Sequence, residues 1–422
     1  MIRMQIRKRS AVACLIALSG WAVAADQSEE NALSLSASPT DESSDGRFGR
    51  LALELAIGRL QREAGGNGVD SWRTSLDWTL RRKVSPQVGF TLSNRFDAYE
   101  PTDAGAKRVI NSLREAYVSW SSADSGLGID AGRVNLKTGP AVGYNPTDFF
   151  RGASLRSMPT ADPVALREMR QGSVMLRVQR LSGAGSVSMA ISPKLASSPG
   201  TDSFSLDLGS TNDADRVLLT ASNKWSDQLN TQLHLYKRSG DSAQLGASAS
   251  ALVSNSSVAY VEWVGSKEVP AADRLLRSSP GERRGYRASA GFTYTSDTKL
   301  SLSVEGQANS FALGRNDWDR LKIVAPALLQ AYAGNALRQQ DLAPRKAILV
   351  YASQRDLAGS RNLSLTGFVQ SNLQDKSRLY WIELRQRWDS LELAAQLQRT
   401  SGSEFNFLQR RQWAQVQLTL RY

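Results

Sequence analysis

Apolar and polar residues alternate with a period of two along most of the chain. In the final segment, Ala414, Val416, Leu418, Leu420 and Tyr422 share one parity, and polar residues or Arg421 occupy the other. Successive side chains of a β-strand point to opposite faces of the sheet. The segment therefore predicts a strand with one apolar and one polar face.

The same alternation recurs as hairpins. Residues 286–294 and 300–308 alternate on either side of a turn at Ser296-Asp297. Similar short turns are expected at Ser85-Pro86, Asp124-Ser125, Gly183-Ala184, Asp227-Gln228, Asn255-Ser256, Ala358-Gly359 and Asp389-Ser390. Short turns that alternate with longer connections are typical of outer-membrane barrels, in which the periplasmic turns are short and the outer loops long.

The tally of strands between Arg50 and Tyr422 gives about eighteen, an even number that lets the first strand pair with the last. Residues 128–136 and 346–354 alternate poorly, so sixteen strands is the alternative. We therefore predict an all-β fold, a transmembrane antiparallel up-and-down β-barrel over residues 47–422. A barrel of this size holds a water-filled lumen, whereas side chains would fill one of eight strands.

The beginning of the chain has the pattern of a secretory signal peptide over residues 1–24. A basic start is followed by an apolar run at 11–18 and by the small residues Ala22-Val23-Ala24. Residues 25–46 are acidic and rich in serine, which predicts a flexible tail or plug. The only cysteine, Cys14, lies in the predicted signal, so the remaining chain excludes disulfides. Export without a spanning helix leaves the periplasm or the outer membrane, and the strands favour the outer membrane.

Composition and charge agree with a polar inner wall. The hydrophobic fraction is 41%, the mean hydropathy is −0.35, and the net charge of +12 becomes +8 without residues 1–24. The inward parity carries more arginine than acid, and such a lumen would concentrate anions. In the alternative, these residues form salt bridges that brace the wall. The pore-lining candidates are Arg73, Arg81, Arg95, Arg177, Lys224, Arg287, Glu305, Arg385 and Arg387.

Three long connections, at 138–171, 268–284 and 310–345, are candidates for a segment that folds into the pore. The alternative for each is a loop that covers the outer mouth. The last predicts a helix that Asp317 caps and Pro326 kinks. The first is the preferred constriction loop, and its candidate residues are Asn145, Asp148, Arg151, Arg156, Arg167 and Arg170.

Two local patterns resemble known outer-membrane barrels. Residues 113–118 (Leu-Arg-Glu-Ala-Tyr-Val), Gly132-Arg133, Gly139 and residues 145–148 (Asn-Pro-Thr-Asp) resemble porin-like families of large monomeric barrels, including the alginate-export porin and uncharacterised relatives. The usual Trp-Gly is here Thr138-Gly139. This resemblance implies a monomer. Asn-Pro-x-Asp builds turns, so we expect it to anchor the loop rather than contact a ligand. The end of the chain resembles the barrel assembly signal through Leu418, Leu420 and Tyr422.

These patterns predict an outer-membrane channel for small anionic solutes. The alternative is a component that exports or displays an anionic polysaccharide or another polymer. An enzyme is not expected, because His234 is the only histidine and its parity makes it a lumen residue. No cofactor, metal or nucleic acid is expected. The expected partners are outer-membrane lipid, lipopolysaccharide, the solute or polymer, and the barrel-assembly machinery through the C-terminal strand.

Overall fold

The computed structural model of the chain describes residues 49–61, 67–100, 108–276, 281–402 and 412–422. The predicted signal peptide (1–24) and acidic tail (25–46) lie outside the described residues.

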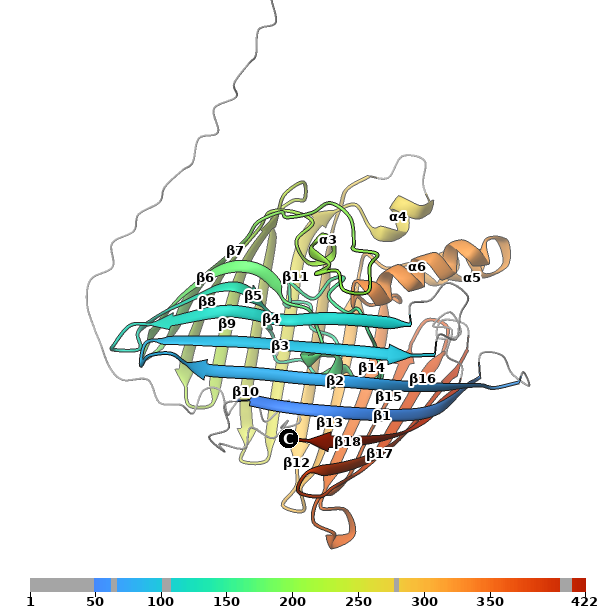
Figure 1. The fold of residues 1–422 in the computed structure, drawn as a ribbon. Helices are drawn as coiled ribbons and strands as arrows, with labels where there is room; N and C mark the ends of the chain where they lie inside the picture. Colours follow the sequence, from blue (N-terminus) through green and yellow to red (C-terminus); the bar gives the residue numbers. More distant parts are fainter. Residues whose placement is uncertain (1–48, 62–66, 101–107, 277–280, 403–411) are drawn as a thin grey trace, which may run out of the picture.

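The described residues form eighteen strands that close into one antiparallel barrel (Figure 1). Each strand pairs with its neighbours in sequence, and β18 pairs with β1 to close the ring. The strands are β1 Gly49–Gln61, β2 Val69–Lys83, β3 Val88–Tyr99, β4 Val109–Ser121, β5 Leu127–Val134, β6 Ser173–Ser182, β7 Gly185–Ser192, β8 Arg216–Ser226, β9 Leu229–Arg238, β10 Gln244–Ser254, β11 Ser257–Glu268, β12 Arg283–Thr295, β13 Leu300–Asn309, β14 Lys346–Arg355, β15 Leu363–Asn372, β16 Arg378–Arg387, β17 Leu391–Ser401 and β18 Gln412–Arg421. The predicted all-β barrel is confirmed, and the poorly alternating segments form β5 and β14, so the count is eighteen rather than sixteen.

The two faces of the wall differ as the alternation predicts. On β18, Val416 points outward and is 45% exposed, whereas Gln415 and Gln417 on the other parity are buried. On β12, the apolar Phe292 and Tyr294 are likewise exposed and Thr293 is buried. The barrel thus carries an apolar outer surface and a polar inner one, the distribution found in barrels that face lipid.

Short helices lie in the connections. They are α2 Pro163–Glu168, α3 Leu208–Thr211, α4 Ala271–Leu276, α5 Arg315–Val324, α6 Pro326–Arg338 and the 3₁₀ turn η1 Leu357–Gly359. Among the described residues, no helix is both long and apolar enough to cross a membrane.

The helix predicted near Asp317 differs in its boundaries. Gly314, not Asp317, occupies the N-cap of α5, and Pro326 begins α6 rather than kinking one continuous helix. Proline suits the first turn of a helix because that turn leaves N–H groups without partners in any case. Trp318 and Leu329 are buried in these helices, whereas Val324 is 76% exposed and Leu328 is 41% exposed.

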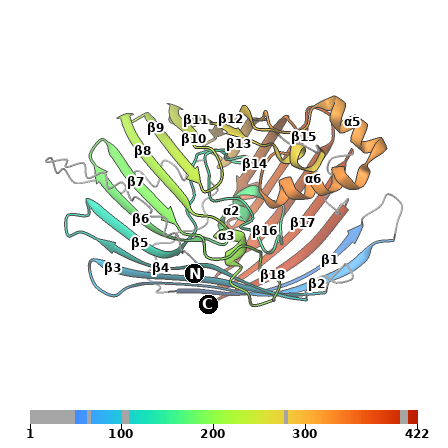
Figure 2. The ribbon, with the colours of Figure 1, turned by 90° about the horizontal axis from the view of Figure 1, so that it is seen from above.

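Two connections fold into the barrel, and their helices α2 and α3 lie inside the ring of strands in the view from above (Figure 2). We call residues 135–172, between β5 and β6, the lumen loop, and residues 193–215, between β7 and β8, the second lumen loop. Phe150 of the lumen loop packs with Leu218 and Tyr236 on the inner wall. Ala141 and Val142 pack on another part of the wall, against Tyr260 of β11 and against β14 to β16. Two apolar clusters therefore lie between the lumen loop and the wall, and another lies among α4, α5 and α6.

Candidate functional site

The lumen loop reaches from one side of the barrel to the other. At one end, Glu262 of β11 accepts a hydrogen bond from the Ala141 N–H at 2.8 Å. At the other, the Pro159 carbonyl accepts hydrogen bonds from Gln415 of β18 at 3.2 Å and Arg73 of β2 at 3.5 Å. β2 and β11 lie half a ring apart. Any solute that crosses the barrel must therefore pass beside this loop.

The charged residues predicted for the constriction hold the lumen loop in shape. Asp148 is fully buried and pairs with Arg170 at 2.7 Å and with Arg167 at 3.4 Å. Arg151 donates to the carbonyls of Asn145, Pro146 and Asp148, each at 3.0 Å. All of these contacts lie within the lumen loop, and the anchoring role of the Asn-Pro-Thr-Asp segment stays a prediction.

Arg156 connects the two lumen loops to the wall. Its guanidinium donates to the carbonyls of Asn111 on β4, at 2.9 Å, and of Asp202 and Ser205 in the second lumen loop. Arg133 of β5 donates to the Leu206 carbonyl at 2.7 Å. The second lumen loop was not among the segments predicted to fold into the pore, although Arg133 and Arg156 both bind its backbone.

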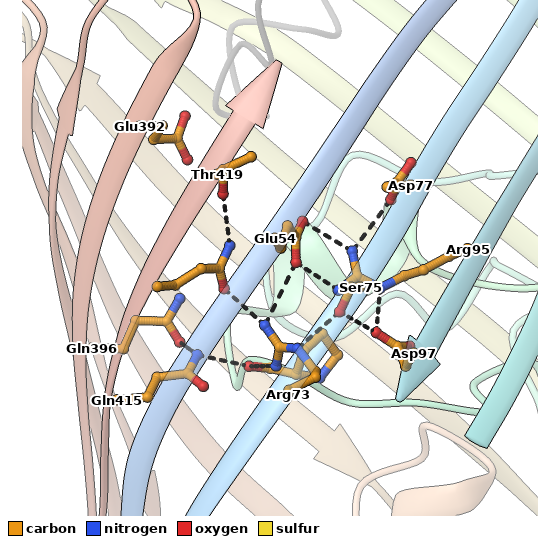
Figure 3. Close-up of polar contacts among 12 residues, drawn as sticks. Glu54, Arg73, Ser75, Asp77, Arg95, Asp97, Glu392, Gln396, Gln415 and Thr419 are labelled. Carbon is orange, nitrogen blue, oxygen red and sulfur yellow. Dashed lines mark hydrogen bonds and ion pairs between the residues drawn. The ribbon is translucent and has the colours of Figure 1, made fainter. Parts of the chain in front are cut away.

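Four arginines on the inner wall of β2, β16 and β18, here called the arginine column, are Arg73, Arg385, Arg387 and Arg421. Figure 3 shows the first of them, Arg73. Arg73 donates to Gln417 at 2.8 Å and lies 3.5 Å from Glu54. Arg385 pairs with Glu383 at 2.7 Å and also with Glu392. The arginine column continues toward the end of the barrel at which the short turns lie, here called the short-turn end.

At that end, Glu392 is shared by Arg387 at 3.1 Å and Arg421 at 2.5 Å. The exposed fraction of each of these two arginine side chains is 34%, whereas that of Glu392 is 2%. The carboxylate thus lies behind the guanidinium groups. The guanidinium groups are thus the more exposed part of this group of ion pairs.

Arg95 lies in a buried group of ion pairs that braces β1 to β4. It contacts Glu54 at 2.7 Å, Asp97 at 3.0 Å and Asp77 at 3.3 Å (Figure 3). Arg114, which was not among the candidates, pairs with the same Asp77 at 2.5 Å. The Arg95 side chain is 3% exposed, so its position fits the bracing alternative rather than contact with a solute.

The other predicted pore residues are spread around the ring. Arg81 is exposed at the short-turn end of β2. Arg177 pairs with Asp130 at 3.4 Å, and Lys224 pairs with Asp227 at 3.1 Å. The remaining two are Arg287, which pairs with Glu268 and Asp341, and Glu305, which the lumen loop covers completely.

One titratable group of the lumen loop faces the arginine column. The Asp162 side chain accepts a hydrogen bond from the Val164 N–H at 3.1 Å and so caps α2. Burial, followed by the nearby carboxylate of Glu383, raises the pKa of Asp162 to about 6. Asp162 therefore changes its charge in the weakly acidic range.

His234 lies on the inner face of β9, as its parity predicts. It is 1% exposed, its Nδ1 lies 3.1 Å from the Thr220 hydroxyl, and Phe149 of the lumen loop covers its ring. Among the described residues, no group of three or more histidine, cysteine or acidic side chains is placed to hold a metal ion.

Comparison with solved structures identifies the same fold in several porins and related proteins. The OccAB1 structure of Acinetobacter baumannii has 12% identity, covers 91% of this chain and 99% of its own, and gives a TM-score of 0.57. A BenF-like porin from Pseudomonas fluorescens Pf-5 has 12% identity over 90% and 98%, with a TM-score of 0.54. OccK8 (OprE) of Pseudomonas aeruginosa has 10% identity over 89% and 98%, with a TM-score of 0.52.

At these identities the likeness establishes the fold alone. No protein-family model and no curated protein matches the chain. The resemblance to the alginate-export porin remains a prediction.

Proposed function

We propose that this protein is an outer-membrane channel for small solutes, with a preference for anions. The observation that carries the anion preference is the column of arginines in front of buried carboxylates, above all Arg387 and Arg421 in front of Glu392. Low-dielectric walls strengthen the field of such groups and raise the local concentration of anions. Each guanidinium also offers a planar fork that suits carboxylates and phosphates.

The lumen loop supports passage of small solutes over export of a polymer. A polymer needs a continuous wide bore, but the lumen loop contacts Glu262 of β11 and, through the Pro159 carbonyl, Arg73 of β2, half a ring away. We propose that small molecules pass beside this contact. Export or display of an anionic polysaccharide is therefore the less favoured function.

The location and partners follow from the outer surface. Exposed apolar side chains such as Ile57, Leu233 and Val416 suit contact with outer-membrane lipid and lipopolysaccharide. The pairing of β18 with β1 suits recognition of the last strand by the barrel-assembly machinery. We further propose that the protein acts as a monomer and without enzymatic activity, in keeping with the porin-like fold.

Liposome swelling tests this function. Vesicles that contain the folded protein are diluted into isotonic solutions of a small dicarboxylate, a neutral sugar of similar size or a cationic amino acid. The dicarboxylate should enter fastest, and vesicles with heat-denatured protein should not swell. Equal entry of the sugar, or faster entry of the cation, would remove the anion preference. If no solute enters, the result would contradict the proposed channel function.

A further inference from the structure

Two buried carboxylates on the inner wall accept hydrogen bonds from one short segment of the lumen loop. Glu262 of β11 accepts hydrogen bonds from the N–H groups of Ala141, at 2.8 Å, and Thr147, at 3.1 Å. It also accepts from the Thr147 hydroxyl at 2.7 Å and the Asn145 amide at 3.2 Å. Every one of these donors belongs to residues 141–147.

Glu305 of β13 holds the middle of the same segment. The successive N–H groups of Val142, Gly143 and Tyr144 point to its carboxylate, at 2.8, 3.2 and 2.9 Å. Consecutive backbone N–H groups that converge in this way form a concave site for an anion. Here the anion belongs to the wall, so the loop wraps around a side chain of the barrel.

The wall adds two donors of its own to Glu305. The Tyr260 hydroxyl donates at 2.8 Å and the Gln307 amide donates at 2.8 Å. Gly291 lies opposite Tyr260 in the neighbouring strand, and a Cβ there would meet the tyrosine ring at 2.4 Å. The missing side chain thus lets the hydroxyl reach the carboxylate.

We infer that Glu262 and Glu305, here called the carboxylate clamp, are positioning residues that fix the lumen loop and so set the size and steadiness of the pore. Both side chains have 0% exposure, and neither makes an ion pair within the described residues, so hydrogen bonds with the loop and the neighbouring wall satisfy them. Neither can touch a solute. Hydrogen bonds to an ionised acceptor are shorter and stronger than neutral ones, which suits the clamp to hold backbone at one position. The inference rests on the proposed channel but not on its anion preference.

The alternative is that the two glutamates act only through their charge on passing ions. Substitution by glutamine removes the charge and turns an amide donor toward N–H groups that need an acceptor. Substitution of Glu305 by aspartate keeps the charge but withdraws the carboxylate by roughly 1.5 Å, the length of one carbon–carbon bond. These variants therefore separate position from charge.

Single-channel recording in planar bilayers tests the clamp. We expect Glu262→Gln and Glu305→Gln to show a several-fold larger conductance or frequent switching between levels, and Glu305→Asp to change in the same direction. Thr147→Val removes one loop donor to Glu262 without altering the wall and should show a weaker form of the same change. Thr293→Val is the matched control, because it makes the same change on the inner wall, where the Thr293 hydroxyl lies 2.7 Å from the Ser303 hydroxyl of the neighbouring strand. It should conduct like the parent.

Parent-like conductance and noise in both glutamine variants would overturn the inference. So would a parent-like Glu305→Asp beside an altered Glu305→Gln, because that result assigns the effect to charge. Heat-modifiable migration on gels verifies that each barrel is folded. If the glutamine variants do not fold, the comparison of Thr147→Val with Thr293→Val decides: equal conductance in the two overturns the clamp. A parent channel that prefers cations would contradict the proposed anion preference. The comparison of the clamp variants with their control would still be valid.

Discussion

At the scale of single residues, the close approach of the lumen loop to the wall explains why glycine stands at position 139. Gly139 has φ of +87°, a region that side chains other than glycine rarely adopt. A Cβ at this position would lie 2.3 Å from a carboxylate oxygen of Glu262. The glycine of the porin-like pattern thus serves the carboxylate clamp.

We predict that Gly139→Ala displaces the lumen loop. The added methyl group cannot fit beside Glu262, so single-channel conductance should become larger or unsteady. Gly240→Ala is the matched control, since Gly240 has φ of +88° but nothing within 4 Å of an added Cβ. Both variants bear a backbone cost of about 1–2 kcal/mol. A parent-like channel from Gly139→Ala would show that the steric contact does not control the loop.

A second residue-scale prediction concerns pH. Because the pKa of Asp162 is raised to about 6, this group is mostly ionised at pH 7 and mostly protonated at pH 5. Protonation removes a negative charge beside the arginine column. Anion preference, measured as reversal potential in a salt gradient, should therefore rise as the pH falls from 7 to 5.

Asp162→Asn should remove this pH dependence and give at pH 7 the preference that the parent reaches at pH 5. Asparagine also caps helices well, so α2 is expected to keep its position. An unchanged pH dependence in the variant would assign the titration to another group.

The sequence could predict inward parity but not the partners of each residue. It placed Arg385 and Arg387 in the lumen, and the register puts Arg387 opposite Glu392 on the next strand. Glu262 was missed because its donors lie more than a hundred positions away, in a loop whose path periodicity does not determine. One signal was available: Glu262 is an isolated acid between Tyr260 and Val264 on the inward parity of β11.

At the scale of elements, alternation and turn chemistry predicted the strands well. Even β5 and β14 form, because pairing with both neighbours supplies the hydrogen bonds that a weak local pattern does not favour. Loops were harder. Residues 193–215 have no strong periodicity, and they are ordered by contacts with Arg133 and Arg156 from elsewhere in the chain.

The last strand carries the element-scale prediction. In β18, Leu418 and Leu420 lie opposite Leu55 and Leu53 of β1, and the Tyr422 N–H donates to the Leu51 carbonyl at 2.8 Å. Deletion of Tyr422, or replacement of Leu420 and Tyr422 by aspartate, should sharply lower the amount of folded barrel in the outer membrane. Charge on a lipid-facing position opposes insertion, and this strand also closes the ring.

Heat-modifiable protein in purified outer membranes measures that outcome. Thr419→Ser is a suitable control, because position 419 faces the lumen on the same strand and is buried. Normal folded levels in both the deletion and the aspartate variant would contradict the role assigned to the terminal residues.

At the scale of the whole molecule, the interior of the barrel has two parts: one is occupied by the two lumen loops, and the other is lined by the arginines of β16 and β18. The second lumen loop is held by Arg133 of β5. The lumen loop packs against β8 and β9, and its Pro159 carbonyl contacts Arg73 of β2 and Gln415 of β18. The arginines of β16 and β18 lie beyond this contact, toward the short-turn end. Arg287 is less suitable for a test than those arginines, because Glu268 and Asp341 both pair with it at the other end of β12.

The reversal potential of single channels in a salt gradient is the most direct test of the proposed anion preference. The parent should prefer anions, and Arg385→Gln combined with Arg387→Gln should shift the potential toward cations by exposing the charges of Glu383 and Glu392. The shift should shrink at 1 M salt, where the Debye length falls from roughly 8 Å to about 3 Å. A parent that prefers cations, or a double variant with an unchanged potential, would contradict the arginine-lined anion channel.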